Sequence, residues 1–211
     1  MNDARAQDLT VGPDGVARCG WPGLQHADYR DYHDREWGKP VHGESALLER
    51  LCLEGFQSGL SWLVILRKRP AFRRAFAGFD AEVVADFTET DVRRLLTDES
   101  IVRNRRKIEA TIANARATLG LREHGGLEEL LWTHAPEPTP RPRRFADVPT
   151  QSAESELLAK RLRKAGFEQV GPTTLYAAMQ ACGLVDDHLV GCFRAGSARS
   201  GLRPTEMRAT S

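Results

Sequence analysis

Long apolar runs are absent from this sequence of 211 residues. No stretch holds 18 uninterrupted apolar residues, and residues 1–5 lack the basic and then apolar order of a secretory signal. We therefore expect a cytoplasmic protein without a membrane partner. With 41% hydrophobic and 28% charged residues, the chain can form one or two globular cores, which excludes collagen, coiled coil and wholesale disorder.

Cysteine is scarce and the net charge is small. The four cysteines, at positions 19, 52, 182 and 192, are too few and too scattered for a disulfide framework, so they are buried thiols or metal ligands. Lysine and arginine total 30 against 29 aspartates and glutamates, which gives a net charge of +1. For the whole chain, this balance is weak evidence against nucleic-acid binding.

Several common signatures are also missing. The sequence has no glycine-rich phosphate loop, no Gly-x-Ser-x-Gly element and no His-Glu-x-x-His, so the common nucleotide-binding, hydrolase and metalloprotease assignments lack their motifs. Strands and helices do not alternate as in a parallel sheet, and no internal repeat is present. Because the strand–helix alternation and the repeat are absent, we expect a mainly α fold.

Most of the chain has the apolar periodicity of helices. We predict helices over 44–54, 91–97, 105–119, 127–134, 152–165 and 173–182, and a proline-rich loop over 136–142. Segment 152–165 is the clearest, because acids in its first turn and bases in its last match the helix dipole. The turn sequence 11–16 lies between two short extended pieces and predicts a small hairpin. Cys52 and Cys182 lie in apolar stripes, so we assign both to the core.

The other two cysteines are candidate metal ligands. His188 and Cys192 are four residues apart, so on a helix they face the same side and can hold one ion. Cys19 and His33 supply a second pair, which would complete a Cys₂His₂ tetrahedron. A zinc ion held by four protein ligands would be structural and would tie the N-terminal segment to the C-terminal helix. The alternative is that Cys192 is a small buried thiol and His188 a hydrogen-bonded surface histidine.

Aromatic and acidic residues gather between residues 20 and 66. Glu54 opens the run 54–62, where two glycines interrupt the preceding helix, and such a loop can expose a carboxylate and an indole to a ligand. Residues 20–66 hold four bases and seven acids, a net charge of −3. A carboxylate beside aromatic faces suits a flat cationic or electron-poor ring, although an aromatic core with a surface glutamate is the alternative. The aromatic residues are Trp21, Tyr29, Tyr32, Trp37 and Trp62.

Positive charge gathers elsewhere. Residues 67–107 hold 11 bases against 7 acids and residues 141–164 hold 7 against 3, so each segment carries +4. Such clusters can grip phosphates, although solvated helix faces explain charge runs just as well. Segment 166–174 adds a tight turn with two glycines, whose amides could cradle a phosphate together with the following helix N-terminus. The candidate phosphate-binding residues are Arg105, Arg106, Lys107, Gly166, Val170, Gly171 and Thr173.

Four blocks of sequence are distinctive: RCGW at 18–21, YHDxEWG at 32–38, LEGxQxGLSW at 53–62 and MQACGLVxDHxVGC at 179–192. Together they resemble the bacterial 3-methyladenine DNA glycosylase I family, which belongs to the helix-hairpin-helix glycosylase superfamily. Segment 166–174 resembles the hairpin of that superfamily. The resemblance runs over 18–194, so we expect one helical glycosylase domain there, with a flexible extension over 1–17 and a flexible tail over 195–211.

The resemblance also implies roles for individual residues. Glu54 falls on the residue that hydrogen-bonds the excised base. Asp186 lies in a Val-Asp-x-His setting, where many glycosylases of the superfamily carry a catalytic aspartate; this family is not generally credited with one, so Asp186 is a secondary candidate. One structural zinc ion is implied, with Cys19, His33, His188 and Cys192 on its ligand positions. The aromatic neighbours of the base would be Trp62, Trp21, Tyr32 and Tyr29.

The implied reaction is hydrolysis of the bond between deoxyribose and 3-methyladenine after the base is flipped from double-stranded DNA, which leaves an abasic site and the free base. The expected enzyme is monomeric. Two alternatives stay open from the sequence: a non-enzymatic, zinc-stabilised module that binds DNA or senses damage, and a glycosylase for another alkylated purine. The division of charge, −3 around the proposed pocket and +4 in each of two other segments, fits a cationic base and a phosphate backbone respectively.

Overall fold

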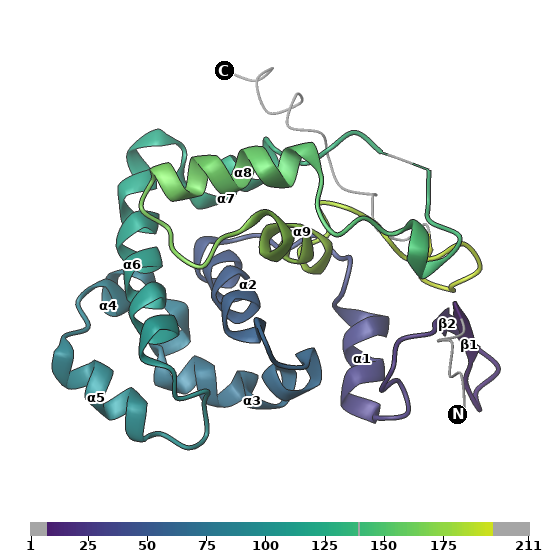
Figure 1. Ribbon diagram of the computed structural model, residues 1–211, viewed down its shortest axis with the longest axis horizontal. Helices are drawn as coiled ribbons and strands as arrows, with labels where there is room; N and C mark the ends of the chain where they lie inside the picture. Colours follow the sequence, from purple (N-terminus) through teal and green to yellow (C-terminus); the bar gives the residue numbers. More distant parts are fainter. Residues whose placement is uncertain (1–7, 139, 196–211) are drawn as a thin grey trace.

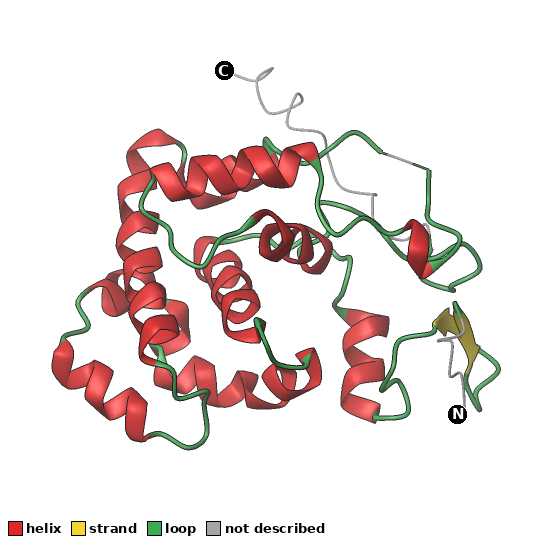
Figure 2. Ribbon diagram, in the orientation of Figure 1, coloured by secondary structure: helices red, strands yellow, loops and turns green. Residues whose placement is uncertain are grey.

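The computed structural model of the protein describes residues 8–138 and 140–195. Over these residues the chain is mainly helical, as predicted (Figures 1 and 2). The helices are α1 (Ala27–Arg35), α2 (Glu44–Gln57), α3 (Trp62–Ala75), α4 (Ala81–Ala85), α5 (Glu89–Thr97), α6 (Arg105–Leu121), α7 (Gly126–Trp132), α8 (Ala153–Lys164) and α9 (Pro172–Ala181), with short 3₁₀ turns at Ala77–Phe79, Arg122–His124 and Phe145–Asp147. None of the helices in the described ranges is long and apolar enough to cross a membrane.

Helix α2 forms the centre of the fold (Figure 1). It packs against α3, α6, α7 and α9, and Leu47, Leu48 and Leu53 are completely buried. A helix that is apolar on nearly every side belongs in the interior, because each exposed apolar face would cost free energy in water. Glu54 lies at the start of the last turn of this helix, so its backbone is placed inside the core.

Two short strands form the predicted N-terminal hairpin. Strand β1 (Leu9–Val11) pairs antiparallel with β2 (Ala17–Cys19), with Leu9 opposite Cys19. The turn contains Gly15 in the left-handed region at φ 73°, which a glycine adopts without strain. The amide of Phe193 donates to the carbonyl of Ala17 at 2.9 Å, so the hairpin lies beside the last described residues, next to α1 (Figure 1).

The six predicted helices are present, and three others were missed. Helix α1 has the sequence ADYRDYHDR, which carries no apolar stripe, and α3 contains Pro70, which normally ends a helix. Helix α4 has only 5 residues, too few for periodicity to detect. Of the two glycines expected to interrupt the helix, Gly55 does not, because α2 continues to Gln57 with Gly55 inside it; the helix ends just before Gly59.

Helices α8 and α9 are joined by the tight turn expected at 166–174. Ser152 caps α8 by accepting from the amide of Ser155 at 3.2 Å, and α8 ends at Lys164. Gly166 then adopts φ 99°, a conformation that reverses the chain after a helix. The two helices pack against each other. The proposed boundaries at 17 and 195 stay predictions, and residues 1–7 and 196–211 lie outside the described part.

Candidate active site and metal centre

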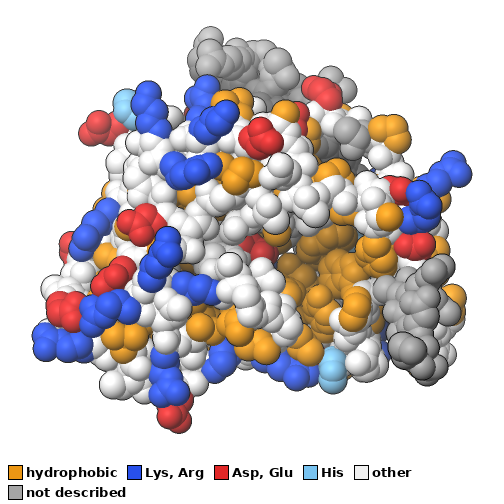
Figure 3. Space-filling view, viewed as in Figure 1, with side chains coloured by type: hydrophobic (Ala, Val, Ile, Leu, Met, Phe, Trp, Pro, Cys, Tyr) orange, Lys and Arg blue, Asp and Glu red, His pale blue; other side chains and the backbone are white. Residues whose placement is uncertain are grey.

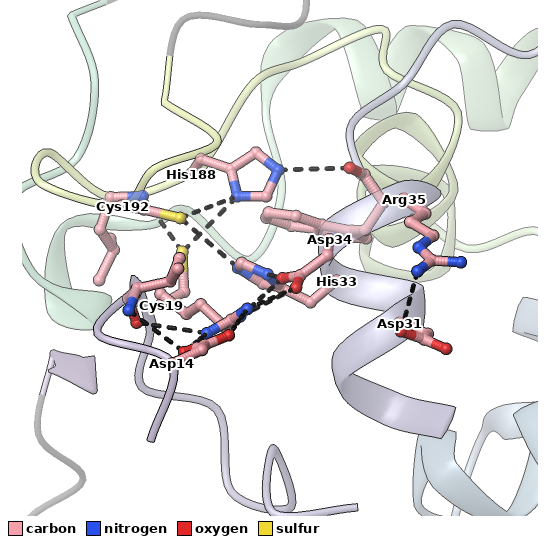
Figure 4. A network of polar contacts seen from close by, with 12 residues as sticks. Asp14, Cys19, Asp31, His33, Asp34, Arg35, His188 and Cys192 are labelled. Carbon is pink, nitrogen blue, oxygen red and sulfur yellow. Dashed lines mark hydrogen bonds and ion pairs between the residues drawn. The ribbon is translucent and has the colours of Figure 1, made fainter. Parts of the chain in front are cut away.

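The four candidate metal ligands come together in the structure. One donor atom from each of Cys19, His33, His188 and Cys192 lies within 4.8 Å of the others, and all four residues are buried (Figure 4). Cys192 Sγ lies 3.6 Å from His33 Nε2 and 3.7 Å from His188 Nδ1, and Cys19 Sγ lies 3.7 Å from His188 Nδ1. The cluster joins the N-terminal and C-terminal segments, as predicted.

The donor set fits a tetrahedral zinc ion. Zinc–sulfur bonds of about 2.3 Å and zinc–nitrogen bonds of about 2.0 to 2.1 Å at tetrahedral angles separate sulfur from nitrogen by about 3.6 Å. The three sulfur–nitrogen separations given above, 3.6 to 3.7 Å, match this value. In addition, the amide of Leu189 donates to Cys19 Sγ at 3.4 Å, which favours the thiolate form that a metal requires.

The prediction that His188 and Cys192 face the same side of a helix was wrong. It assumed a helix, whereas residues 185–192 have no helical structure. Helix α9 ends at Ala181, and Gly183 and Gly191 adopt φ 74° and 95°, so the chain turns repeatedly around the candidate metal site. The two side chains meet through this irregular loop.

Both histidines are oriented by hydrogen bonds behind the ligands. The Nδ1–H of His33 donates to Asp34 at 2.8 Å, and Asp34 in turn accepts from the guanidinium of Arg18 at 2.8 to 3.0 Å. Arg18 is only 6% exposed and also binds Asp14 in the hairpin turn. The Nε2–H of His188 faces the carbonyl of Trp37 at 3.3 Å. These partners leave Nε2 of His33 and Nδ1 of His188 directed at the metal position (Figure 4).

Aromatic rings connect the metal centre with Trp62. Trp21 meets the ring of His33 edge-on at 4.9 Å and lies 6.4 Å from Tyr32, whose ring is 5.4 Å from Trp62. Tyr29 lies 5.4 Å from Trp21 and 6.5 Å from Tyr32. The structure therefore brings the four predicted aromatic residues into one cluster, and His33 of the candidate metal site is packed directly against it.

Glu54 is a buried carboxylate. Glu54 is only 7% exposed. This burial raises the pKa of its carboxyl group from 4.5 to about 8, although the positive charge of Arg50 opposes the shift. No residue in the described ranges donates a hydrogen bond to the carboxylate. The expectation of an exposed carboxylate on a loop was therefore wrong. A buried, unpartnered acid is costly to keep, and such groups mark functional sites.

The aromatic side chains near Glu54 include one buried polar atom that lacks a partner among the described residues. Burial and the charge of Glu54 together raise the pKa of Tyr29 and Tyr32, which places both rings near the carboxylate. The indole Nε1 of Trp62 is buried without a hydrogen-bond acceptor in the part of the chain that the structure describes. Figure 3 shows a hollow lined by hydrophobic side chains between α1 and the ends of α2, α3 and α9. The cluster can therefore enclose a flat apolar ring and offer it hydrogen bonds.

The candidate phosphate-binding residues differ in what they contact. The amides of Val170, Gly171 and Thr173 donate to no described residue and stay available at the start of α9. Arg105 forms ion pairs with Glu89 at 2.9 Å and Glu109 at 3.1 Å. The ammonium of Lys107 donates to two backbone carbonyls within the fold.

Asp186, the secondary catalytic candidate, is already paired. Its carboxylate accepts from Arg141 at 2.6 Å and from the backbone amide of His188 at 3.3 Å. The next residue, Asp187, is buried and accepts from Tyr176 and Gln180, both at 2.8 Å. The two acids therefore fix the loop that carries His188, whereas Glu54 has no such partner.

Sequence reasoning missed several residues that position the site. Asn114 on α6 accepts from the amide of Glu168 at 2.7 Å and donates to its carbonyl at 3.2 Å, and so fixes the α8–α9 turn next to Gln169. Gln169 adopts φ 56°, which is unusual for a residue with a side chain. Arg18 was part of a recognised block, but its contacts with Asp14 and Asp34 could not be foreseen.

Comparison with known proteins identifies clear relatives. Residues 21–195 match the model of the methyladenine glycosylase family. The chain is 45% identical to DNA-3-methyladenine glycosylase 1 of Escherichia coli (strain K12) over 181 residues, which cover 84% of this chain and 96% of that protein. A crystal structure of 3-methyladenine DNA glycosylase I is 44% identical with a TM-score of 0.80 and covers 83% of this chain and 98% of its own. A structure of the Staphylococcus aureus glycosylase that addresses 3-methyladenine recognition is 34% identical with a TM-score of 0.78, and covers 85% and 96%.

Proposed function

Because the chain belongs to the methyladenine glycosylase family, we propose that Glu54 and the aromatic side chains around it form its pocket for the excised base. The protein is a DNA-3-methyladenine glycosylase I that removes 3-methyladenine in base-excision repair. The observation that carries the assignment of the pocket is the buried carboxylate of Glu54, which has no hydrogen-bond donor in the described ranges.

The substrate explains why a buried acid is useful. Methylation at N3 gives adenine a positive charge while it is still attached to deoxyribose, so the base is already a good leaving group. Water adds to C1′ as the bond to N9 breaks. The electron pair of that bond goes to the base, which leaves as neutral 3-methyladenine, and a proton of the water passes to solvent. Little acid catalysis is needed, so selective binding of the base is the main task of the protein.

The pocket distinguishes the damaged base by charge and hydrogen bonding. The flipped base stacks between Trp62, Trp21 and Tyr32, with Tyr29 beside them, and cation–π attraction favours the methylated ring. Glu54 accepts from the exocyclic amino group that pairing used in the duplex. A nearby cation favours the ionised carboxylate, so binding of the charged base offsets the cost of ionising Glu54. An unmodified adenine brings no such charge. Asp186 is the secondary candidate for steadying the developing sugar cation.

A structural zinc ion supports this pocket. We assign its ligands to Cys19, His33, His188 and Cys192, whose separations fit a closed tetrahedral shell. When bound, the ion supplies a cross-link between the two ends of the domain. Since Trp21 packs edge-on against His33 at 4.9 Å, the same ligands also hold one wall of the pocket.

The α8–α9 turn holds the DNA backbone in this proposal. The free amides of Val170, Gly171 and Thr173 at the start of α9 face a phosphate, with Gly166 shaping the turn and Arg106 adding positive charge. Arg105 contributes to the field while paired with acids. The partners are therefore double-stranded DNA that contains 3-methyladenine and, after excision, the free base.

One assay tests the function against both alternatives. Methylated duplex DNA is incubated with the protein, and two products are measured: alkali-labile abasic sites and the free bases released. We expect abasic sites together with free 3-methyladenine. Binding without abasic sites would indicate a damage-sensing module, and release of mainly another alkylated purine would indicate a different lesion. Unmethylated DNA of the same sequence is the control.

A further inference from the structure

The side chain of Lys107 crosses from α6 to the C-terminal end of α2, the helix that carries Glu54. Its ammonium donates to the carbonyl of Phe56 at 2.7 Å and to the carbonyl of Ser58 at 2.7 Å. The last turn of α2 contains no basic residue of its own. Lys107 therefore supplies, from 51 positions away in the sequence, the cation that the end of this helix lacks.

The end of a helix benefits from such a cation. Its last carbonyls have no intrahelical donor, and the helix dipole places partial negative charge there. Hydrogen bonds from an ammonium to these oxygens are charge-assisted and hold the backbone more firmly than neutral ones. Desolvation lowers the pKa of Lys107, in keeping with an ammonium that faces protein atoms.

The segment fixed by Lys107 connects two pocket residues. Beyond Ser58 the chain passes through Gly59 at φ 84° and closes a tight turn, in which Gln57 Nε2 donates to the carbonyl of Leu60 at 2.8 Å and the amide of Leu60 donates to the carbonyl of Gln57 at 2.7 Å. Helix α3 then begins at Trp62. The positions of Glu54 and Trp62 relative to each other therefore depend on the residues that Lys107 holds.

We propose that Lys107 is a positioning residue for base recognition: its ammonium fixes the connection between α2 and α3 and thereby sets the distance between Glu54 and Trp62. This rests on the proposed function, in which those two residues bind the excised base. The role differs from the phosphate contact that the sequence suggested for Lys107, because the ammonium is directed at two carbonyls of its own chain.

Two matched variants test the proposal. Lys107→Met keeps the length of the side chain but removes the ammonium. Lys68→Met removes the same kind of interaction elsewhere, because Lys68 Nζ donates to the carbonyls of Glu99 and Ser100, both at 3.0 Å. For each variant we measure the affinity for free 3-methyladenine by tryptophan fluorescence, the single-turnover excision rate, and the salt dependence of binding to undamaged duplex DNA.

The expected result is specific to Lys107. Its replacement by methionine weakens the affinity for free 3-methyladenine and slows excision by about tenfold or more, since small displacements of binding groups cost factors of 10 to about 100. The slope of DNA affinity against salt stays unchanged. Lys68→Met leaves the affinity for the free base unchanged, even where both variants lose similar thermal stability. Lys107→Arg, whose guanidinium can span the two carbonyls, restores most of the affinity.

Other results overturn the proposal. Equal affinity of Lys107→Met and the parent for free 3-methyladenine would do so. A salt slope reduced by about 0.9, with base affinity unchanged, would instead make Lys107 a phosphate contact. If the methionine variant does not fold, Lys107→Gln, whose shorter and neutral side chain also removes the ammonium, takes its place, and the same loss of affinity for the free base is expected. A parent protein that releases no 3-methyladenine would refute the proposed function itself, which is a separate outcome.

Discussion

Replacement of Glu54 by glutamine should stabilise the folded protein, and increasingly so at higher pH. Burial raises the pKa of Glu54 from 4.5 to about 8, so the folded protein holds a proton on this acid that the unfolded chain has already lost. Between these two pH values the folded state binds more protons than the unfolded state, and the free energy of unfolding must therefore fall as the pH rises. Glutamine has nearly the same shape and never ionises, so the variant avoids this penalty.

The size of the effect follows from the two pKa values. At about 1.4 kcal/mol per pH unit, the interval between 4.5 and about 8 corresponds to roughly 5 kcal/mol once Glu54 is ionised in both states. At pH 7, where Glu54 is ionised in the unfolded chain but still mostly protonated in the folded protein, the loss in the free energy of unfolding is on the order of 3 kcal/mol. At pH 5 this loss is below about 1 kcal/mol. The gain in stability of Glu54→Gln should follow the same course.

Urea denaturation of the parent and of Glu54→Gln at pH 5, 7 and 9 measures the difference directly. Glu123→Gln is the matched control, because Glu123 is exposed and its replacement should leave the pH dependence of the parent unchanged. A stability difference between parent and Glu54→Gln that stays constant from pH 5 to pH 9 would refute the reasoning. So would a parent that is more stable than the variant at pH 9.

Two further predictions concern the pH profile and the metal. The kcat/KM for excision should rise with pH towards the pKa of Glu54, about 8, and level off above it, because the ionised carboxylate accepts from the cationic base. The pH profile of Glu54→Gln should lack this rise. Identical pH profiles for the two proteins would contradict the assignment of Glu54. Metal analysis should find about one zinc ion per chain, and Cys19→Ala should lose it and also weaken binding of free 3-methyladenine, since His33 packs against Trp21. A metal-free, fully folded parent would contradict the second prediction.

Local sequence patterns predicted the parts of the fold that depend on neighbouring residues. Acids at the start and bases at the end of α8 located that helix, and the turn residues at 11–16 located the hairpin. The ligand set followed from residue types, and the structure brings the four side chains together. The path of the chain around the candidate metal site did not follow. Residues 182–192 are shaped by Gly183 and Gly191 in the left-handed region, by the contact of Asp186 with Arg141 45 positions away, and by the contact of Asp187 with Tyr176 on α9.

The sequence identified Glu54 but misjudged its environment. Glycine at position 55 suggested the end of a helix, whereas close packing of α2 against its neighbours keeps the helix intact to Gln57. The contacts that position the pocket and the α8–α9 turn come from α6, where Lys107 and Asn114 meet residues 51 and 54 positions away. Such contacts depend on tertiary packing, and no periodicity or motif reports them.

The most direct test of the account is the single-turnover release of free 3-methyladenine from methylated duplex DNA by the parent and by Glu54→Gln, with the zinc content of both proteins measured in the same samples. We predict that the variant keeps about one zinc ion per chain and releases the base at least about tenfold more slowly, as expected for loss of a buried hydrogen bond to a charged group. Equal rates for the two proteins would contradict the role assigned to Glu54.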